Sequence, residues 1–501
     1  MTQKPKAPEL PTEPPKKGAA PQGGPKPPLA AKLSPHAPAG KPPIPSADPD
    51  SHFYPPHLEY LKGYQQTISE TATLRHQGKI TQMIGGVIEA YNPGTSVGHV
   101  CVIYNPDTGK RGFGEVVGFR DDKILLMSLG EMPDISPRCL VIPDDRPPRV
   151  RVGDSLLGRV LNGLGRPIDD KGEIVTPFEV PLYTEPLNPL RRKRISKALD
   201  VGVRAINGLL TCGQGQRIGI MAGSGVGKSV LLGMMARHTT ADVNVIALVG
   251  ERGREVLEFI ERDLGETGMS RTVVVVATSD QPPLIRTRAA YVATSIAEFF
   301  RDQGQNVLFM MDSVTRFAMA QREIGLAAGE PPTTKGYPPS VFNQLPRLLE
   351  RCGMSDGQGS MTGFYTVLVE GDDPNEPIAD AVRSIVDGHI LLSRDLAAGG
   401  QYPAIDLLHS TSRVMTDVVN KSHKRDAQRF ISTLATYREA EDLINIGAYI
   451  RGSNQRIDYS LNKIDAIIDY IKQQVEEPAP LAQCEAFLER LFSDFEQPQK
   501  H

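Results

Sequence analysis

The chain reads Ala222-Gly223-Ser224-Gly225-Val226-Gly227-Lys228-Ser229 near its middle, directly after the apolar run Ile218–Met221. The helical run Val230–His238 follows it. This order of strand, glycine-rich loop and helix matches the phosphate-binding P-loop at every position but the first, where Ala222 stands in place of glycine. An ordinary glycine-rich turn is the alternative, and the flanking strand and helix argue against it. The stretch therefore predicts a nucleotide site.

Each part of such a loop has a chemical task. The glycines let backbone N–H groups surround phosphate oxygens, and the helix N-terminus adds a favourable dipole for an anion. Lys228 reaches the β- and γ-phosphates, and the Ser229 hydroxyl coordinates Mg²⁺. The predicted cofactors are ATP and Mg²⁺, and the predicted nucleotide contacts in the loop are Gly223, Ser224, Gly225, Val226, Gly227, Lys228, Ser229 and Val230.

Around the loop, residues 151–425 alternate between apolar runs and helical stretches. We expect buried strands at Ile218–Ala222, Asn244–Val249, Thr272–Ala277, Val307–Met311, Phe364–Val369 and Ile390–Ser393. Helical stretches follow residues 228, 252, 285 and 313. Such alternation is typical of a mostly parallel sheet covered on both faces, so the predicted fold class is α/β.

Two acidic segments follow predicted strands. The apolar run Val307–Met311 ends in Asp312, as a Walker B element requires, because that strand delivers a carboxylate to the Mg²⁺ site. The alternative for Asp312 is a plain helix N-cap. Gly250-Glu251-Arg252-Gly253-Arg254-Glu255 follows the strand Val245–Val249, so its acids belong at the carboxyl edge of the sheet, where ligands of open α/β sheets bind. A solvated helix start is the alternative for this second segment.

The regions flanking the α/β segment differ from it. Residues 78–150 carry short β-prone runs between Gly and Pro turn signals, which predicts a small β-barrel. The expected strands are Met83–Ala90, His99–Tyr104, Gly114–Phe119 and Lys123–Ser128. Residues 426–501 are rich in Glu, Lys, Leu, Ile and Gln and predict a C-terminal helical domain.

The N-terminal region is of another kind. Residues 1–50 hold 15 of the 42 prolines and no aromatic residue, so we expect a disordered tail over 1–55. A solubilising tail and a basic tether are both open readings of it. Apolar residues three to four apart predict an amphipathic helix over 56–77, which either packs on the barrel or binds a partner.

Composition excludes several classes of protein. The net charge of −3 argues against a dedicated nucleic-acid binder, which would be basic. The basic run Arg191–Arg194 has no interleaved aromatic residues, and we interpret it as solvated. Five widely spaced cysteines without a CxxC motif favour reduced thiols over disulfides or a zinc site. No apolar run is long enough for a membrane span, and no signal-peptide core is present.

Further segments carry a resemblance to a known family. Gly250–Glu255 looks like the catalytic-glutamate motif of rotary-type ATPases, and Tyr402–Asp406 with Ser410–Arg413 resembles their signature segment. Gly329–Phe342 and Glu370–Asp373 resemble the ATPases of type III protein export, in their flagellar form. The resemblance covers about residues 80–470. It implies a RecA-like P-loop ATPase core with an N-terminal β-barrel and a C-terminal helical domain, and Ala222 is no departure from the flagellar pattern.

The resemblance also implies roles for single residues. Glu251 is the general base that orients the attacking water, and Arg252 contacts the γ-phosphate region. Glu255 holds a water near Mg²⁺, and Tyr402 stacks on adenine. Arg413 is an arginine finger that reaches the site of a neighbouring subunit. For Tyr402 the alternative is a packed aromatic at a strand end, and for Arg413 it is a structural salt bridge.

The implied function is ATP hydrolysis at subunit interfaces of a homohexamer that drives flagellar export. Implied partners are a stalk protein, a negative regulator, export chaperones and substrates, and the membrane export gate, with no nucleic acid. The implied location is the cytoplasm, peripherally at the inner membrane. An ATPase of a virulence-type injectisome is the near alternative. An RNA motor and a ring component that only binds nucleotide are more distant ones.

Overall fold

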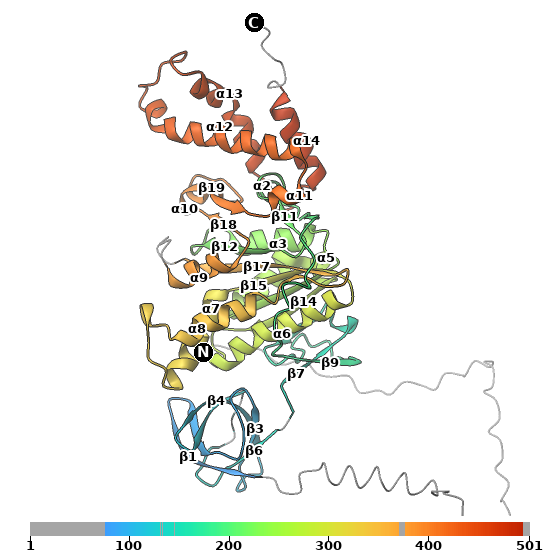
Figure 1. The fold of residues 1–501 in the computed structure, drawn as a ribbon, viewed down its shortest axis with the longest axis vertical. Helices are drawn as coiled ribbons and strands as arrows, with labels where there is room; N and C mark the ends of the chain where they lie inside the picture. Colours follow the sequence, from blue (N-terminus) through green and yellow to red (C-terminus); the bar gives the residue numbers. More distant parts are fainter. Residues whose placement is uncertain (1–75, 131, 133, 145, 370–375, 494–501) are drawn as a thin grey trace, which may run out of the picture. The chain divides into compact units, whose positions relative to one another are not determined.

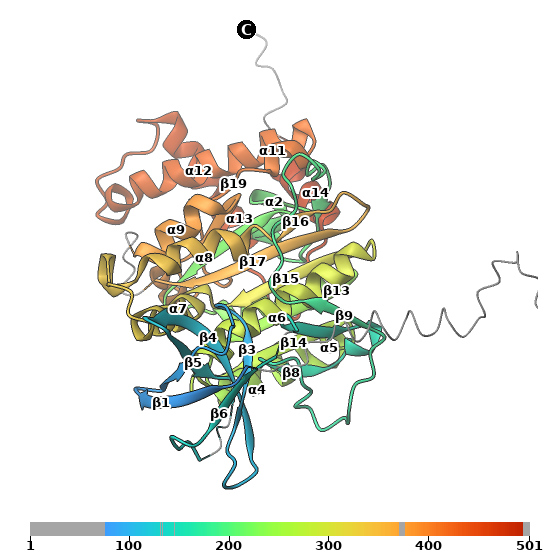
Figure 2. The same cartoon turned by 60° about the horizontal axis from the view of Figure 1, so that its bottom comes forward.

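The computed structural model describes residues 76–130, 132, 134–144, 146–369 and 376–493, shown as a ribbon in Figure 1. The predicted tail over 1–55, almost all of the predicted helix over 56–77 and the segment Glu370–Asp373 lie outside the described residues. Three parts follow one another along the described chain: a β-barrel, an α/β domain and a group of helices (Figures 1 and 2).

Six short strands close the N-terminal barrel in the order β1-β2-β5-β4-β3-β6. Their bounds are β1 Gly78–Ile84, β2 Val87–Tyr91, β3 Val100–Tyr104, β4 Arg111–Arg120, β5 Lys123–Ser128 and β6 Leu140–Pro143. The predicted single strand Met83–Ala90 is wrong, because Gly85 and Gly86 turn the chain there with φ of 56° and 84°. Glycine adopts such angles without steric cost, so one apolar run becomes a hairpin.

A nine-stranded sheet forms the centre of the α/β domain, with eight strands in the order β19-β18-β12-β17-β15-β13-β14-β8 and β16 paired to β17. The strands are β8 Val160–Asn162, β12 Arg217–Ala222, β13 Val243–Val249, β14 Thr272–Ala277, β15 Asn306–Asp312, β16 Gly353–Met354, β17 Ser360–Leu368, β18 Gly388–Leu392 and β19 Ile405–Ser412. Pairing is parallel from β8 through β18, whereas β19 and β16 pair antiparallel. The parallel strands therefore bring their carboxyl ends to one edge, as the alternation predicted. Two short ladders pair β7 Arg149–Val152 with β9 Phe178–Pro181, and β10 Ala198–Leu199 with β11 Cys212–Gly213.

Helices cover both faces of this sheet, and alternate side chains of one strand belong to different cores. On β15, Phe309 and Met311 join one apolar cluster, whereas Leu308 and Met310 join the other. The first cluster includes residues of α6 Pro283–Asp302, α7 Val314–Ala327, α8 Pro339–Leu349 and α9 Pro377–Ile385. The second includes residues of α2 Arg204–Leu209 and α3 Lys228–His238. Shorter helices are α4 Gly253–Glu258, α5 Gly265–Met269, α10 Arg394–Ala398 and α11 Met415–Val418.

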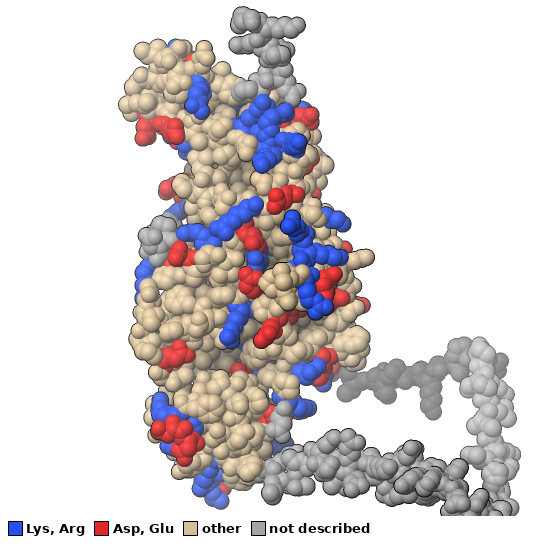
Figure 3. All heavy atoms as spheres, viewed as in Figure 1, with Lys and Arg blue, Asp and Glu red and all other residues tan. Residues whose placement is uncertain are grey.

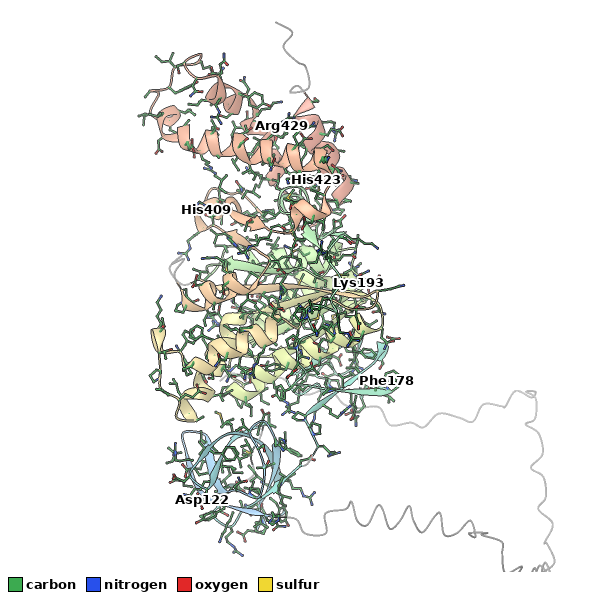
Figure 4. The ribbon with its side chains drawn as sticks, in the orientation of Figure 1. Asp122, Phe178, Lys193, His409, His423 and Arg429 are labelled. Atoms are coloured by element: carbon green, nitrogen blue, oxygen red, sulfur yellow. The ribbon has the colours of Figure 1, made fainter. Side chains whose placement is uncertain are left out.

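Three helices end the described chain: α12 Lys421–Asn445, α13 Gln455–Ile471 and α14 Leu481–Leu491. They share the second apolar cluster with the sheet, through Phe430 and Tyr470 among others. His423, labelled on α12 in Figure 4, places Nε2 2.7 Å from the carbonyl oxygen of Gly208 in α2. The helices are thus anchored on the α/β domain. Within the described residues, no helix is long and apolar enough to cross a membrane.

Charged side chains of both signs are interspersed over the face drawn in Figure 3, in line with the near balance of acids and bases. The prediction of a wholly solvated Arg191–Arg194 run is wrong for Arg192. Its side chain is largely buried and donates to the carbonyl oxygens of Leu187 and Cys352, while Lys193 lies at the surface (Figure 4). All five cysteines are buried and free.

Candidate functional site

The predicted loop joins the carboxyl end of β12 to the first turn of α3. Gly225 and Gly227 take φ of 79° and 87°, values that favour glycine, and nothing lies within 4 Å of the position where a Cβ on Gly225 would be. Ala222 is fully buried as the last residue of β12 and packs in the second apolar cluster. A methyl group at this position therefore fits the core, which explains how the chain departs from the strict motif.

A cavity of about 770 Å³ opens beside this loop. Its size suits a nucleotide, since small-molecule sites commonly measure ~300–1,000 Å³. Its lining comes from the ends of several parallel strands and the turns after them: Ala222, Gly223, Ser224, Gly225, Gly227, Lys228, Ser229, Val230, Gly250, Glu251, Arg252, Glu255, Ser279, Thr315, Arg316, Met319, Leu368, Val369 and Arg394.

Three charged groups meet at the base of this cavity. The Lys228 Nζ atom contacts the Asp312 carboxylate and lies 3.6 Å from Glu251 Oε1. Burial alone would lower the pKa of Lys228, but the two carboxylates outweigh burial and raise it. Lys228 is therefore held in its charged form, ready to contact an anionic phosphate. Asp312 is not an N-cap, because Ser313 caps α7 by accepting from the Arg316 backbone.

Glu251 has the ionisation expected of a proton acceptor working near neutrality. Burial and the nearby Asp312 charge raise its pKa to about 7, while Lys228 opposes the shift. Its neighbour Glu255 shifts the other way: a hydrogen bond from Glu251 lowers the pKa of Glu255. Among the described residues, no group hydrogen-bonds to the buried Oε1 atom of Glu251. The ionisations of the two carboxylates are therefore linked, and Glu251 is the weaker acid of the pair.

These residues fit the group that the loop implies, a nucleotide with Mg²⁺. The cavity combines an anion-binding loop, a charged lysine and acids with an unsatisfied oxygen. In the described part of the chain, no cluster of three or more His, Cys, Asp or Glu side chains forms a metal cage. Mg²⁺ at nucleotide sites takes one or two protein ligands and otherwise phosphate oxygens and water, so a few acids beside a phosphate loop suffice to hold it.

Two arginines flank Glu251, of which only one was predicted. Arg252 is exposed and lies 3.6 Å from Glu255. Arg316, from the first turn of α7, lines the cavity and has a buried Nε atom without a hydrogen-bond partner among the described residues. Its side chain packs against Gly250, where a Cβ would come within 2.7 Å of it. The sequence signal that could have identified Arg316 is its position four residues after Asp312, on a helix that begins at the site.

Tyr402 and Arg413 lie just outside the two ends of the same strand, β19. Leu392 pairs with Ile405, and Ala222 with Leu392, so the start of β19 is level with the phosphate loop. The Tyr402 ring lies 3.7 Å from the Cβ position of Gly227 and is half exposed. The alternative of a packed strand-end aromatic does not describe a ring with this exposure.

Arg413 follows the far end of β19, where Ser412 pairs with Gly388 at the amino end of β18. Eight residues of strand separate it from the loop edge, about 25 Å at the usual rise. The Arg413 backbone N–H donates to the carbonyl oxygen of Asp387, and its side chain is exposed. The structure therefore does not bring Arg413 together with the Glu251 of its own chain.

Comparisons with known proteins agree with this architecture. Residues 80–143 match the ATP synthase alpha/beta family, beta-barrel domain, and residues 202–412 match its nucleotide-binding domain. Residues 419–490 match the T3SS EscN ATPase C-terminal domain. The flagellum-specific ATP synthase of Bacillus subtilis is 55% identical over 427 residues, covering 85% of this chain and 97% of that protein. The chain belongs to this family of ATPases.

Relatives named for type III secretion systems are similar as well. The type 3 secretion system ATPase of Xanthomonas euvesicatoria is 51% identical over 411 residues, or 81% of this chain and 93% of that protein. The assembled ATPase EscN of enteropathogenic E. coli superposes with a TM-score of 0.79 at 45% identity, covering 83% of this chain and 99% of EscN. The RecA-like core with a barrel and a helical C-terminal domain is thus the fold of this ATPase family.

Proposed function

We propose that this chain is the ATPase that energises flagellar type III export. The observation that supports hydrolysis most directly is the cluster of Lys228, Glu251 and Asp312 beneath the phosphate loop, in which Glu251 has a pKa of about 7. The flagellar assignment is supported by the identity of 55% to the flagellum-specific relative of Bacillus subtilis, compared with 51% to the type 3 secretion system ATPase of Xanthomonas euvesicatoria.

The chain's own groups divide the reaction among them. Backbone N–H groups from Gly223 to Val230 and the Lys228 ammonium bind the phosphates, and Tyr402 stacks on the adenine. Ser229 and Asp312 would hold Mg²⁺, and Glu255 would lie near it. When bound, the metal would supply positive charge that offsets the charge of the phosphates.

Glu251 orients the attacking water and accepts its proton, which its pKa near 7 permits at cellular pH. Arg252 contacts the γ-phosphate region, and Arg316, which also lines the cavity, adds a second positive charge. Arg413 of an adjacent copy completes the site, because the arginine of the same chain lies at the wrong edge of the sheet.

That division requires an oligomer, and we propose a homohexameric ring. The solved relative EscN is described as assembled and also in complex with its central stalk EscO. Here the last turn of α12 and the loop that joins it to α13 expose Leu443, Ile446 and Ile450, of which the two isoleucines are each 75% exposed. We assign this apolar tip to a stalk protein. A negative regulator, export chaperones with their substrates, and the membrane export gate are the other proposed partners, with the ring in the cytoplasm at the inner membrane.

A complementation experiment tests the function. The gene is deleted, and cells receive the wild type, Glu251→Gln or the control Glu258→Gln, which changes an exposed acid at the end of α4, the helix that follows Glu251. Flagellar filaments are then counted. We expect the wild type and Glu258→Gln to restore filaments and Glu251→Gln to fail. Unchanged filament numbers in the deletion contradict the flagellar function, and loss of effector secretion in the same strain would assign the chain to an injectisome.

Purified protein separates the remaining alternatives. Steady MgATP turnover that Glu251→Gln abolishes excludes a ring that only binds nucleotide. Turnover that single-stranded RNA leaves unchanged excludes an RNA motor.

A further inference from the structure

Thr366 carries a buried hydroxyl near the carboxyl end of β17. It has no exposed surface and shares its side of the sheet with Phe364 two residues earlier. Valine would fill such a position in a sheet interior equally well. A buried hydroxyl costs free energy unless it is hydrogen-bonded, so the partner of Thr366 indicates what its oxygen does.

That partner is the acid of the Walker B strand. The Thr366 Oγ1 atom lies 2.7 Å from Asp312 Oδ1 and 3.1 Å from the carbonyl oxygen of Met311. A hydroxyl has one proton to donate, and the nearer, charged acceptor forms the stronger bond. Thr366 therefore donates to the Asp312 carboxylate.

The two oxygens of this carboxylate are held differently. Two described side chains, Lys228 and Thr366, contact the Asp312 carboxylate, and both do so at its Oδ1 atom. Lys228 comes from the loop side and Thr366 from the neighbouring strand, so Oδ1 is held from two directions. Oδ2 is then the atom left for Mg²⁺ or for a water bound to it.

We propose that Thr366 is a positioning residue for the metal-binding carboxylate. Its hydroxyl fixes the side chain of Asp312 so that Oδ2 serves Mg²⁺ even when Lys228 turns towards phosphate. This inference rests on the proposed function, because it assumes that Asp312 serves Mg²⁺. It adds a residue of β17 that the P-loop and Walker B patterns do not contain.

If Thr366 only stabilised the sheet, removing its hydroxyl would disturb the pairing of β17 with its neighbours. Backbone pairing already joins β17 to β12 and β15, with Ile220 opposite Thr366 and Met311 opposite Tyr365. Removing the hydroxyl should therefore leave the sheet intact. Partners that orient metal ligands typically contribute ~10–100-fold to metal affinity or activity.

The test measures binding of the fluorescent nucleotide mant-ADP to the full-length chain, once with Mg²⁺ and once with EDTA. The variants are Thr366→Val, which keeps the shape, and Thr366→Ser, which keeps the hydroxyl. Thr362→Val is the matched control, because Thr362 is a buried threonine on the same strand whose hydroxyl accepts from the Gly215 backbone, away from the acids. Thermal unfolding of each variant reports its folding.

Mg²⁺ raises the affinity of the wild type for mant-ADP, and we expect this increase to be about tenfold smaller in Thr366→Val. The affinity of Thr366→Val in EDTA should equal that of the wild type. Thr366→Ser and Thr362→Val should keep the wild-type gain. The proposal is overturned if Thr366→Val keeps the full gain, if it weakens binding equally in both conditions, or if Thr366→Ser or Thr362→Val loses as much. A wild type that binds no mant-ADP in either condition overturns the proposed function together with this inference.

Discussion

The two edges of the central sheet are built in opposite ways. At the carboxyl edge, Lys228, Glu251 and Asp312 are largely buried, and Lys228 pairs with both carboxylates. At the amino edge, Arg413 is exposed, and its backbone is held by Asp387, whose carboxylate is bound by both Nε and Nη2 of Arg217 at 3.0 and 3.1 Å. One edge is a preformed pocket, and the other is a rigid platform for a single projecting charge.

This difference is the basis of the proposed ring, in which one polypeptide builds a whole active site only together with its copies. β19 carries Tyr402 before its start and Arg413 beyond its end, so in the proposed ring one strand would serve two pockets. If Arg413 of the next subunit completes the site, the rate of hydrolysis depends on contact between neighbours and therefore on assembly. The following predictions separate the contributions of the two edges.

The largest effect is expected at the amino edge. Arg413→Ala should lower kcat of the assembled protein about 10³–10⁵-fold, the usual contribution of an arginine finger. Binding of mant-ADP by dilute single subunits should not change, since Arg413 is far from the pocket of its own chain. Arg438→Ala, which removes an exposed arginine from α12, is the control and should leave kcat at the wild-type value.

The second effect belongs to the carboxyl edge. Glu251→Gln should lower kcat about 10²–10⁴-fold, as expected when a general base is removed, while MgATP still binds. Single-turnover hydrolysis and equilibrium binding, measured on the same preparation, check both parts. Equal loss of binding and hydrolysis would mean that Glu251 holds the nucleotide and does not act as a base.

The pH dependence should be smaller and should come from the same residue. Glu251 must be deprotonated to accept a proton, and its pKa in the free enzyme is about 7. The value of kcat/KM should therefore rise with pH up to about 7 and fall roughly tenfold per pH unit below it. A profile that is flat from pH 5.5 to 8 would contradict this ionisation, and intact assembly at each pH is the control.

The smallest effect concerns Tyr402. Replacing it with Ala should raise KM for ATP by roughly fivefold, since aromatic stacking contributes about 0.5–1.5 kcal/mol. Tyr402→Phe keeps the ring and should behave as the wild type. If the two variants behave alike, the ring does not stack on adenine.

The carboxyl edge could be predicted from sequence because its parts are local. A glycine-rich loop, a strand ending in Asp312 and a turn with Glu251 each form short patterns, and parallel strands bring their ends together. Six of the nine strands of the central sheet were predicted to within a few residues for the same reason, whereas β8, β16 and β19 were not predicted. The hairpin at Gly85 and Gly86 was missed, since an apolar run hides a turn that depends only on backbone angles.

Other features depend on pairing between distant segments. The strand order, in which β17 lies between β12 and β15, sets Thr366 beside Asp312, and no local pattern encodes that neighbour. Arg316 was missed because the sequence of α7 indicates only a helix that packs on the sheet. The separation of Tyr402 from Arg413 required knowing that β19 runs antiparallel to β18.

The most direct test of the central claim mixes two inactive proteins. Glu251→Gln supplies an intact Arg413, and Arg413→Ala supplies an intact pocket, so random mixing at equal amounts makes about one quarter of the interfaces of a symmetric ring complete. We predict that ATPase activity reappears in the mixture and is absent from either protein alone. A mixture that exchanges subunits yet stays as inactive as its components would contradict a site shared between neighbouring chains.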